Sequence, residues 1–543
     1  MTPDVQPAPA QPLAAAPSPP KPARLAAIID IGATAIRMEI AELDEQGRTR
    51  ILDTLRHGVQ LGRDLFKLGR IQQGTLQECV DILKGFRRVM EEYGITTPDQ
   101  IRAVATSSIR EASNRDTFLD RIYIATRINV RAIDEAEQSR LTFLAAQAVL
   151  DEAPELKTGD VLVADVGGGS TELLLLQQGH ITFSDSYRLG SLRMRETLEM
   201  HRAPTDRVRM ILGQHIQRLV EQVVRNLPVN SAPVLLAISG DARFAAAQLC
   251  PDWPERSSAR IETKALAGFV ERLLPMPAAK IVGRYQLAYE EAETVGPALL
   301  VYLHLARAFK GDNLLVPKAG FRDGLLKEMT LRGGYWTGSF AEQVVHSATA
   351  LAEKYNVDAR HAACVAETSV RLFRELKAEH QLDSRFELLL DVAARLHEAG
   401  GFISSRSHHK HSYYIIYNSD LFGLTREDLA IVALVARYHR RALPSPTHPE
   451  YMALGRDDRI AVSKLAALIR VADALDRNHL QNVRDFTIAR MPDRLLISVR
   501  KIEDLTLERL ALKEKGVLFE EVYGIPVELQ EDRSGDLETR DGG

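Results

Sequence analysis

Apolar strands and amphipathic helices alternate along the first 330 residues of the chain. "AAIIDIGATAIRMEIAEL" (26–43) predicts a strand, a tight turn at Gly32 and a second strand from Ala35. "TLQECVDILKGFRRVMEEYGI" (75–95) has apolar residues at helical spacing, and Thr75 with Glu78 predicts a capping box at its start. "IRAVATSSIREASNRDTFLDRI" (101–122) predicts a buried strand followed by a helix. This alternation indicates α/β layers.

The same pattern returns from about residue 160. Strands are predicted over 161–166, 172–183 and 233–239, and an amphipathic helix is predicted around residues 208–223. "ADVGGGSTELLLL" (164–176) places Asp165, three glycines and Glu172 at the tip of a second hairpin. Two hairpins of one plan suggest a duplicated fold. Because three adjacent glycines carry no Cβ, bare N–H groups can converge there, which predicts an anion site.

Helical periodicity with abundant His and Arg replaces the strands from about Thr337. "VRDFTIARMPDRLLISVRK" (483–501) predicts a short strand-rich appendage, and the last ten residues read as unstructured. The predicted organisation is therefore a disordered Pro/Ala-rich tail at 1–24, α/β units at 25–150 and 151–335, a helical domain with the appendage at 338–510, and a C-terminal extension at 511–543.

Composition adds limits to this organisation. A chain of 543 residues with 45% hydrophobic and 26% charged residues is long enough for roughly three globular domains. The three cysteines show neither disulfide nor metal-ligand spacing, so we expect a cytoplasmic protein. The tail lacks the features of a signal peptide, and no apolar run approaches the roughly 20 residues of a membrane span, so no membrane partner is expected. A formal net charge of -4 argues against a generally basic protein.

Eight motifs, in order along the chain, resemble one family. They are "IDIGATAIRM" (29–38), "LGRDLFKLGRI" (61–71), "ATSSIREASN" (105–114), "DVGGGSTEL" (165–173), "RLGSLRM" (188–194), "ISGDAR" (238–243), "GFRDGLL" (320–326) and "HHKHSYYIIYNSDL" (408–421). Residues 25–335 resemble the exopolyphosphatase/guanosine pentaphosphatase (Ppx/GppA) phosphatase family, and residues 338–500 resemble the HD-like domain of its longer members. The resemblance implies an α/β fold with two ribonuclease H-like, actin-like ATPase domains around a phosphate-binding cleft, followed by an all-α HD-like domain.

The resemblance implies a Mg²⁺-dependent phosphohydrolase that releases terminal orthophosphate from inorganic polyphosphate or acts on guanosine pentaphosphate. Asp165 and Glu172 match functional acids of the family; carboxylates accept but do not donate hydrogen bonds, so they would hold Mg²⁺ or orient the attacking water. The turn at Ala33-Thr34 departs from the usual Ser-Asn. The implied phosphate-binding residues are Asp30, Gly32, Ala33, Thr34, Arg110, Gly167, Gly168, Gly169, Ser170 and Thr171.

Position 138 departs furthest from the family. Members typically have Glu-x-Arg, with Glu as the base that activates water, and counting back from Arg140 gives Gln138. Loss of a general base typically costs about 10²–10⁴ in rate. A glutamine can still orient water in phosphoryl transfer, and Glu137 or Glu135 can take over after a small shift. Two readings stay open: a retained hydrolase, or a catalytically weak or inactive sensor that binds polyphosphate or (p)ppGpp. An actin-like ATPase or sugar kinase is disfavoured because "ISGDAR" has one glycine.

The helical domain adds two further groups of residues. His361, His397-Glu398 and Asp473 match the metal ligands of HD phosphohydrolases, but Glu replaces the Asp of the doublet, so we expect a vestigial site with a structural role. The basic clusters "RSHHKH" and "RYHRR" predict a polyanion track that suits polyphosphate; a solvated helix face is the alternative, and nucleic acid is disfavoured without interleaved aromatics. The resemblance also implies a homodimer. The track residues are His408, His409, Lys410, His411, Arg437, Arg440 and Arg441.

Overall fold

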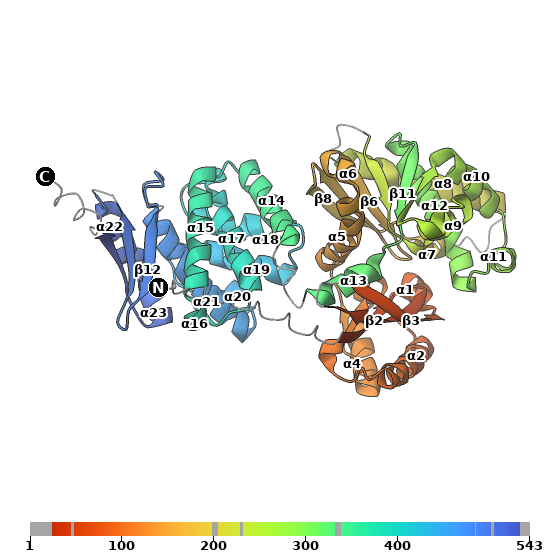
Figure 1. Cartoon of the computed structure of the whole chain (residues 1–543), viewed down its shortest axis with the longest axis horizontal. Helices are drawn as coiled ribbons and strands as arrows, with labels where there is room; N and C mark the ends of the chain where they lie inside the picture. The colour runs from red at the N-terminus through yellow and green to blue at the C-terminus, as the bar shows by residue number, and fades with distance from the viewer. Residues whose placement is uncertain are drawn as a thin grey trace, which may run out of the picture.

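The computed structural model describes residues 24–44, 48–197, 205–227, 232–331, 338–483, 485–500 and 504–532. Two α/β units lie on one side of the molecule, and the helical domain with a third sheet lies on the other (Figure 1). The predictions for residues 1–23 of the tail and for the last ten residues fall outside the described residues. Within the described residues, no helix is long and apolar enough to cross a membrane.

The first unit is built on a five-stranded sheet of order β3-β2-β1-β4-β5. Its central strand β1 is buried on both faces, because Ile29 packs on the side of α2 (Gln73–Glu92) and Ile28 on the side of α5 (Glu135–Glu152) and α13 (Phe321–Thr330). β4 and β5 run parallel to β1, whereas β1, β2 and β3 form an antiparallel meander. The elements are β1 (Arg24–Ile31), β2 (Ala35–Leu43), β3 (Thr49–Gly58), α1 (Leu61–Leu68), α2 (Gln73–Glu92), η1 (Pro98–Gln100), β4 (Ile101–Ala105), α3 (Ser107–Arg110), α4 (Arg115–Thr126) and β5 (Val130–Ala132).

The predicted capping box at Thr75 and Glu78 is wrong. Helix α2 begins at Gln73 and has Gln72 at its N-cap position, so both residues lie inside the helix. The predicted apolar face is confirmed, since Val80, Leu83, Phe86 and Met90 are buried.

The second unit is built on a six-stranded sheet of order β10-β11-β9-β6-β7-β8. The predicted single strand at 172–183 is wrong, because the chain reverses at Gln178 (φ 51) and Gly179 (φ 80) and forms the hairpin β7–β8. Two consecutive residues with positive φ are typical of a tight hairpin turn. The strands are β6 (Asp160–Val166), β7 (Thr171–Gln177), β8 (His180–Tyr187), β9 (Val234–Ala237), β10 (Ser258–Glu262) and β11 (Asn313–Pro317).

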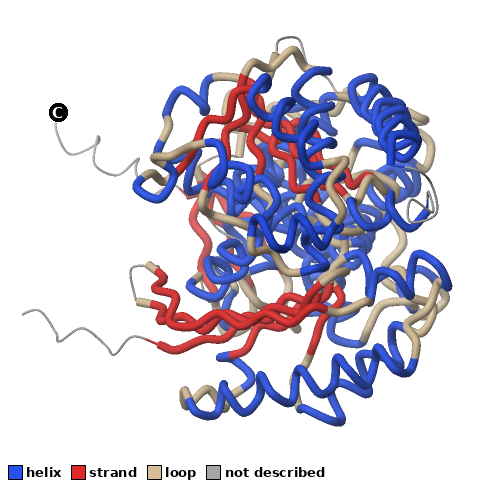
Figure 2. The backbone as a smooth tube through the Cα atoms, turned by 90° about the vertical axis from the view of Figure 1, so that its right-hand side faces the viewer, coloured by secondary structure: helices blue, strands red, loops and turns tan. Residues whose placement is uncertain are grey.

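The helices of the second unit include the predicted amphipathic one, α8. Figure 2 shows the two sheets one above the other, with helices in the space between them. At the centre, the hydroxyl of the fully buried Tyr302 on α12 accepts a hydrogen bond from Val166 N at 3.0 Å and so fixes the end of β6. The helices are α6 (Pro154–Thr158), α7 (Ser191–Thr197), α8 (Thr205–Asn226), α9 (Gly240–Leu249), η3 (Trp253–Glu255), α10 (Thr263–Leu273), α11 (Ala278–Tyr285) and α12 (Tyr289–Ala308).

Two helices join the α/β units. α5 (Glu135–Glu152) leads from the first unit to the second, and α13 (Phe321–Thr330), which follows the last strand of the second sheet, returns to pack on α5 and β1. Leu141 of α5 and Leu325 of α13 share a core with Ile28. The chain therefore passes twice between the units, at the base of the space between the sheets.

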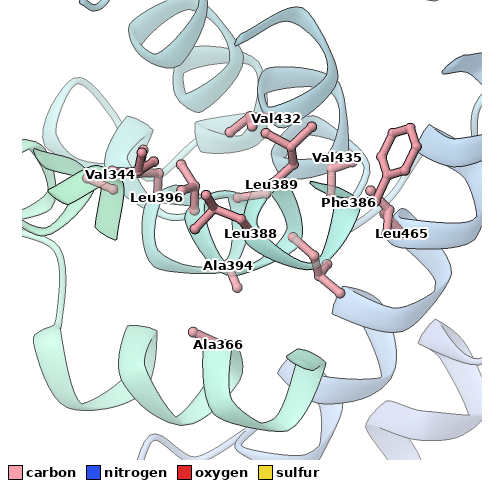
Figure 3. Close-up of a cluster of buried hydrophobic side chains, with 14 of the residues drawn as sticks. Val344, Ala366, Phe386, Leu388, Leu389, Ala394, Leu396, Val432, Val435 and Leu465 are labelled. Carbon is pink, nitrogen blue, oxygen red and sulfur yellow. The ribbon is translucent and has the colours of Figure 1, made fainter. Parts of the chain in front are cut away.

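The helical domain surrounds α17 (Arg385–Leu396), which contacts α14, α15, α19 and α21. Leu388, Leu389 and Leu396 of this helix meet Val432 and Val435 of α19 in one buried cluster (Figure 3). The predicted change to helical structure after residue 337 is thus confirmed. The remaining helices are α14 (Ser339–Lys354), α15 (Ala359–Glu375), α16 (Lys377–His380), η5 (Ala399–Phe402), α18 (His408–Tyr417), α19 (Arg426–Arg437), α20 (Pro449–Met452) and α21 (Arg456–Leu475).

The predicted strand-rich appendage is present as the antiparallel pair β12 (Phe486–Arg490) and β13 (Leu495–Arg500). A third strand, β14 (Val527–Asp532), comes from the extension and runs parallel to β13. Between them, α22 (Thr506–Lys515) and α23 (Val517–Tyr523) pack on α21. The described part of the extension, through residue 532, therefore contributes to the helical domain's core.

Candidate active site between two hairpin tips

The two glycine-containing hairpin tips touch each other. A Cβ added at Gly168, in the β6–β7 turn, would lie 3.0 Å from the Cβ of Ala33, in the β1–β2 turn. On its other side, Ala33 faces Gly62, where an added Cβ would lie 2.9 Å away. The packing around Ala33 therefore leaves room for a methyl group and little more, which accounts for a small residue there.

Helix α7 holds the triple-glycine turn from behind. The carbonyl of Gly167 accepts from Ser191 N, and that of Gly168 accepts from Leu192 N and Arg193 N, all at 3.0 Å. The carbonyl of Gly169 accepts from Arg193 Nε at 2.7 Å. No protein group within the described residues accepts from the amides of Gly168 and Gly169, so these N–H groups are available to an anion.

The two tips line a cavity of about 400 Å³. Residues from both α/β units face it, so a ligand there would contact both. The predicted site residues that line it are Asp30, Gly32, Ala33, Thr34, Gln138, Asp165, Gly167, Gly168, Gly169 and Ser170.

Four other predicted residues do not line this cavity. Thr171 is fully buried and donates its hydroxyl hydrogen to Leu189 O at 2.5 Å, so its role is structural. Arg110 donates to Ile133 O at 3.2 Å and to Glu135 at 3.3 Å, and it lines a neighbouring cavity of about 610 Å³. Glu137 and Glu172 are buried, and neither lines this cavity or the larger one.

Glu137 cannot replace the missing base because its carboxylate is already paired with arginines. Its carboxylate accepts from Arg102 at 2.5 Å and lies 3.5 Å from Arg140. Glu135 points to the larger cavity, where it pairs with Arg110. The position facing the smaller cavity is therefore Gln138 itself.

Gln138 presents an unpaired acceptor. Its side chain is 7% exposed, and no group among the described residues donates to its buried Oε1. Asp134 caps α5 by accepting from Glu137 N at 2.8 Å, which fixes the first turn that carries Gln138. An amide oxygen so placed can orient a water molecule but cannot take its proton.

Asp165 and Glu172 stand directly opposite each other on the antiparallel strands β6 and β7. Burial raises the pKa of Asp165 to about 6 and that of Glu172 to about 7. Glu172 Oε1 accepts from Ser186 at 2.7 Å and from Ser170 at 3.1 Å, whereas its buried Oε2 has no partner among the described residues. Like charges directly opposite each other repel, so this pair requires a proton or a cation. Oxygen donors of this kind fit Mg²⁺.

Four arginines that the sequence did not single out also line the cavity: Arg37, Arg56, Arg243 and Arg322. Arg37 stands opposite Asp30 in the β1–β2 ladder, with its guanidinium 3.8 Å from the carboxylate. An arginine in the largely apolar strand "AIRMEIAEL", whose other charged residues are two glutamates, was the available signal, and "ISGDAR" and "GFRDGLL" contain two of the others. Arginines suit phosphate because their planar N–H groups bind it in pairs.

Asp241, at the start of α9, is a further acid that the sequence analysis missed. It lines the cavity, and burial, with a smaller contribution from Glu291, raises its pKa to about 7. The cavity thus contains a carboxyl group that can exchange a proton near neutral pH.

Comparison with known proteins agrees with this geometry. The sequence profile of the Ppx/GppA phosphatase family matches residues 40–333, and that of Ppx/GppA phosphatase domain III matches residues 345–515. The chain belongs to the Ppx/GppA phosphatase family. It is therefore a hydrolase that acts on phosphoanhydrides, and enzymes of this family are metal-dependent.

Individual relatives are distant. The guanosine-5'-triphosphate,3'-diphosphate pyrophosphatase of Photobacterium profundum is 22% identical over 457 residues, covering 82% of this chain and 86% of that protein. The protein of the same name from Aeromonas hydrophila is 24% identical over 491 residues, covering 88% of this chain and 92% of that protein. An exopolyphosphatase structure from Cytophaga hutchinsonii covers 56% of this chain and 98% of its own, with 20% identity and a TM-score of 0.50. These comparisons confirm the fold of two α/β units followed by a largely helical domain.

The predicted polyanion track of this Ppx/GppA phosphatase is not assembled as expected. His408 and His409 are buried in α18, and burial lowers the pKa of both, for His409 to about 4, so they are neutral. Arg437 pairs with Glu450 at 3.2 Å. Arg440 and His411 are half-buried, which leaves Lys410 and Arg441 as the exposed cations of the set. None of these residues lines either cavity.

The HD-like residues do come together. His361, His397 and Asp473 are buried in one group, and Glu398 lies beside His361 and His479 in a second group that shares His361. This cluster lies in the helical domain and shares no residue with the cavity between the hairpin tips.

Proposed function

We propose that this Ppx/GppA phosphatase releases terminal orthophosphate from inorganic polyphosphate in the cytoplasm. One observation carries the proposal: glycine amides and arginines for an anion line one cavity between the two α/β units together with Asp165, whose directly opposed partner Glu172 completes a carboxylate pair for a cation. That combination suits a phosphoanhydride, whose terminal group is anionic and whose hydrolysis is assisted by a metal.

The chain's own groups would bind and polarise the terminal phosphoryl group. Its non-bridging oxygens would accept hydrogen bonds from the amides of Gly168 and Gly169 on one side and from Arg37 and Arg243 on the other. Hydrolysis of a phosphoanhydride passes through a loose, anionic transition state, so fixed donors around the departing group are the main source of rate.

Asp165 and Glu172 would hold Mg²⁺. The ion would supply positive charge to the phosphate oxygens, and its binding would deprotonate the two carboxyl groups that burial otherwise keeps partly protonated.

Gln138 would orient the attacking water through its unpaired Oε1. The water oxygen forms a bond to the terminal phosphorus, the bridging P–O bond breaks, and the shortened phosphate chain leaves with the electron pair. Asp241, a carboxylate of the same cavity with a pKa of about 7, can take the proton that the water loses. The missing Glu at position 138 therefore does not remove every acceptor.

The larger neighbouring cavity favours a long substrate. Glu172 lies between the two cavities, because Ser170 lines the smaller one and Ser186 the larger one, and both donate to its Oε1. Arg110 and Arg426 line the larger cavity and offer cationic groups to further phosphates. Guanosine pentaphosphate is the second candidate, favoured by the similarity to two guanosine-5'-triphosphate,3'-diphosphate pyrophosphatases over most of the chain.

Phosphate release from long-chain polyphosphate with Mg²⁺ tests the proposal, with guanosine pentaphosphate measured in parallel. We expect release by the native chain, loss in Glu172→Gln, and no change in Gln147→Glu. Gln147→Glu is the matched control for a charge introduced at position 138. Gln147 lies on α5, as Gln138 does, but away from the cavity, where it forms hydrogen bonds with Ser339 and Lys327.

A silent native chain that becomes active as Gln138→Glu would contradict the proposal and favour the sensor of polyphosphate or (p)ppGpp. The expected homodimer is tested separately, by light scattering of the purified chain.

A further inference from the structure

We propose that His361, His397 and Asp473 bind one divalent transition-metal ion inside the helical domain. Each offers one ligand atom, and these atoms all lie within 4.8 Å of one another. His361 Nε2 is 3.7 Å from Asp473 Oδ1. An ion with ligand bonds of about 2.0–2.2 Å can bridge atoms separated by up to roughly 4 Å, so it fits between this pair without rearrangement.

Both histidines leave the same nitrogen unpaired. His361 and His397 are fully buried, and neither Nε2 has a hydrogen-bond partner among the described residues. Buried polar atoms are nearly always paired, and an orphan costs stability. His380, in the same domain, shows the ordinary arrangement: its Nε2 bonds Phe373 O at 2.7 Å, and its Nδ1 accepts from Leu382 N at 2.9 Å.

The other ring nitrogens set the tautomer that a metal requires. His397 Nδ1 lies 2.6 Å from Ala394 O and donates to it, which leaves a lone pair on Nε2. His361 Nδ1 lies 2.7 Å from Asp476 Oδ2, which orients its ring in the same way. A carbonyl or carboxylate behind each ligating histidine is the usual support of a metal site.

Asp473 is also supported from behind. Lys515 of α22 contacts its Oδ2, while Oδ1 faces His361, so one oxygen remains for the ion. His479, whose side chain is 37% exposed, stacks on His361 with ring centroids 3.7 Å apart and marks the side from which an ion would enter. Two imidazoles and one carboxylate favour ions such as Zn²⁺, Mn²⁺, Fe²⁺ or Co²⁺ over Mg²⁺.

The test uses the full chain, stripped with a chelator and titrated with Co²⁺ in excess Mg²⁺. We expect one Co²⁺ ion per chain with imidazole scattering in its X-ray absorption spectrum. Imidazole ligation distinguishes this site from the cavity between the hairpin tips, because no histidine is among the described residues that line that cavity.

Variants then assign the ligands. His397→Gln should weaken Co²⁺ binding by at least about 100-fold, Asp476→Asn by about 10–100-fold, and His380→Gln not at all. Thermal unfolding shows which variants fold, and if His397→Gln does not, the spectrum of the unmodified chain decides. Absence of imidazole-bound Co²⁺ in the unmodified chain would overturn the proposal, and Lys515 would then be the cation that balances Asp473. Unchanged Co²⁺ affinity in a folded His397→Gln would also overturn it.

Discussion

The hairpins β1–β2 and β6–β7 follow one plan but carry different charges. Each has an aspartate before its turn, and the residue directly opposite it is Arg37 for Asp30 and Glu172 for Asp165. The first pair is neutral, whereas the second is a like-charge pair with both pKa values raised. A single position across the ladder therefore decides whether a copy of this motif supplies a cation of its own or requires one from solution.

Neutralising each aspartate should give the largest contrast. Asp165→Asn should weaken divalent-ion binding in the cleft, and phosphate release, by at least about 100-fold, because it removes half of the opposed pair. Asp30→Asn should change ion binding by less than about tenfold, since Arg37 already balances Asp30. Mn²⁺ titration by electron paramagnetic resonance measures the first effect. Equal losses in the two variants would show that both hairpins bind the ion.

Arg37→Gln should act on substrate rather than on metal. Losing a charged partner of the transferred phosphoryl group should lower kcat/KM for polyphosphate by about 10–100-fold, because Arg37 stabilises the anionic transition state as well as the bound substrate. Steady-state kinetics measure this, with Arg50→Gln as the control, because Arg50 of β3 pairs with Glu42 on the surface at 2.7 Å. An unchanged kcat/KM would remove Arg37 from the phosphate site.

The raised pKa of Glu172 predicts how stability depends on pH without metal. Between its ordinary value of 4.5 and about 7, the folded protein keeps a proton on Glu172 that the unfolded chain has lost. Stability from this group is therefore present at low pH and is lost as pH rises toward 7, by on the order of 2 kcal/mol. Thermal unfolding of native chain and Glu172→Gln, from pH 5 to 8, should show their difference change in this sense. A constant difference would contradict the raised pKa.

The smallest expected effect concerns the contact between the tips. Gly168→Ala places a methyl group 3.0 Å from Ala33 Cβ, so we expect a loss of about 1 kcal/mol in stability. Gly74→Ala, in α2 with nothing within 4 Å of an added Cβ, should instead stabilise by about 0.5–1 kcal/mol. Denaturant unfolding separates the two signs. Stabilisation by both variants would mean that the tips are further apart.

Local patterns in the sequence predicted the parts of the fold that are local. The two hairpins, the buried face of α2 and the switch to helices after residue 337 follow from periodicity and turn residues over short windows. The errors are local too. Thr75 looked like a cap, although the helix already begins at Gln73. The turn at Gln178-Gly179 was overlooked, although a polar stretch, residues 177–180, interrupts the apolar positions there.

The cavity was only half predictable, because its arginines come from distant segments. Arg37, Arg56, Arg243 and Arg322 meet through tertiary packing, which no spacing rule reports. The basic clusters led to the prediction of a polyanion track because the sequence does not show which of their residues are buried. His408 looked cationic in sequence, but α18 turns it into the core, where burial lowers its pKa.

The contact of Lys515, in α22, with Asp473 determines where the chain can be truncated without leaving a buried charge unpaired. A fragment that ended at residue 510 would keep every helix around α17 and still bury an aspartate whose cation had been cut away. Its upstream helices would also lose the cover of α23 and β14. Any truncation intended to isolate the helical domain should therefore retain residues through 532.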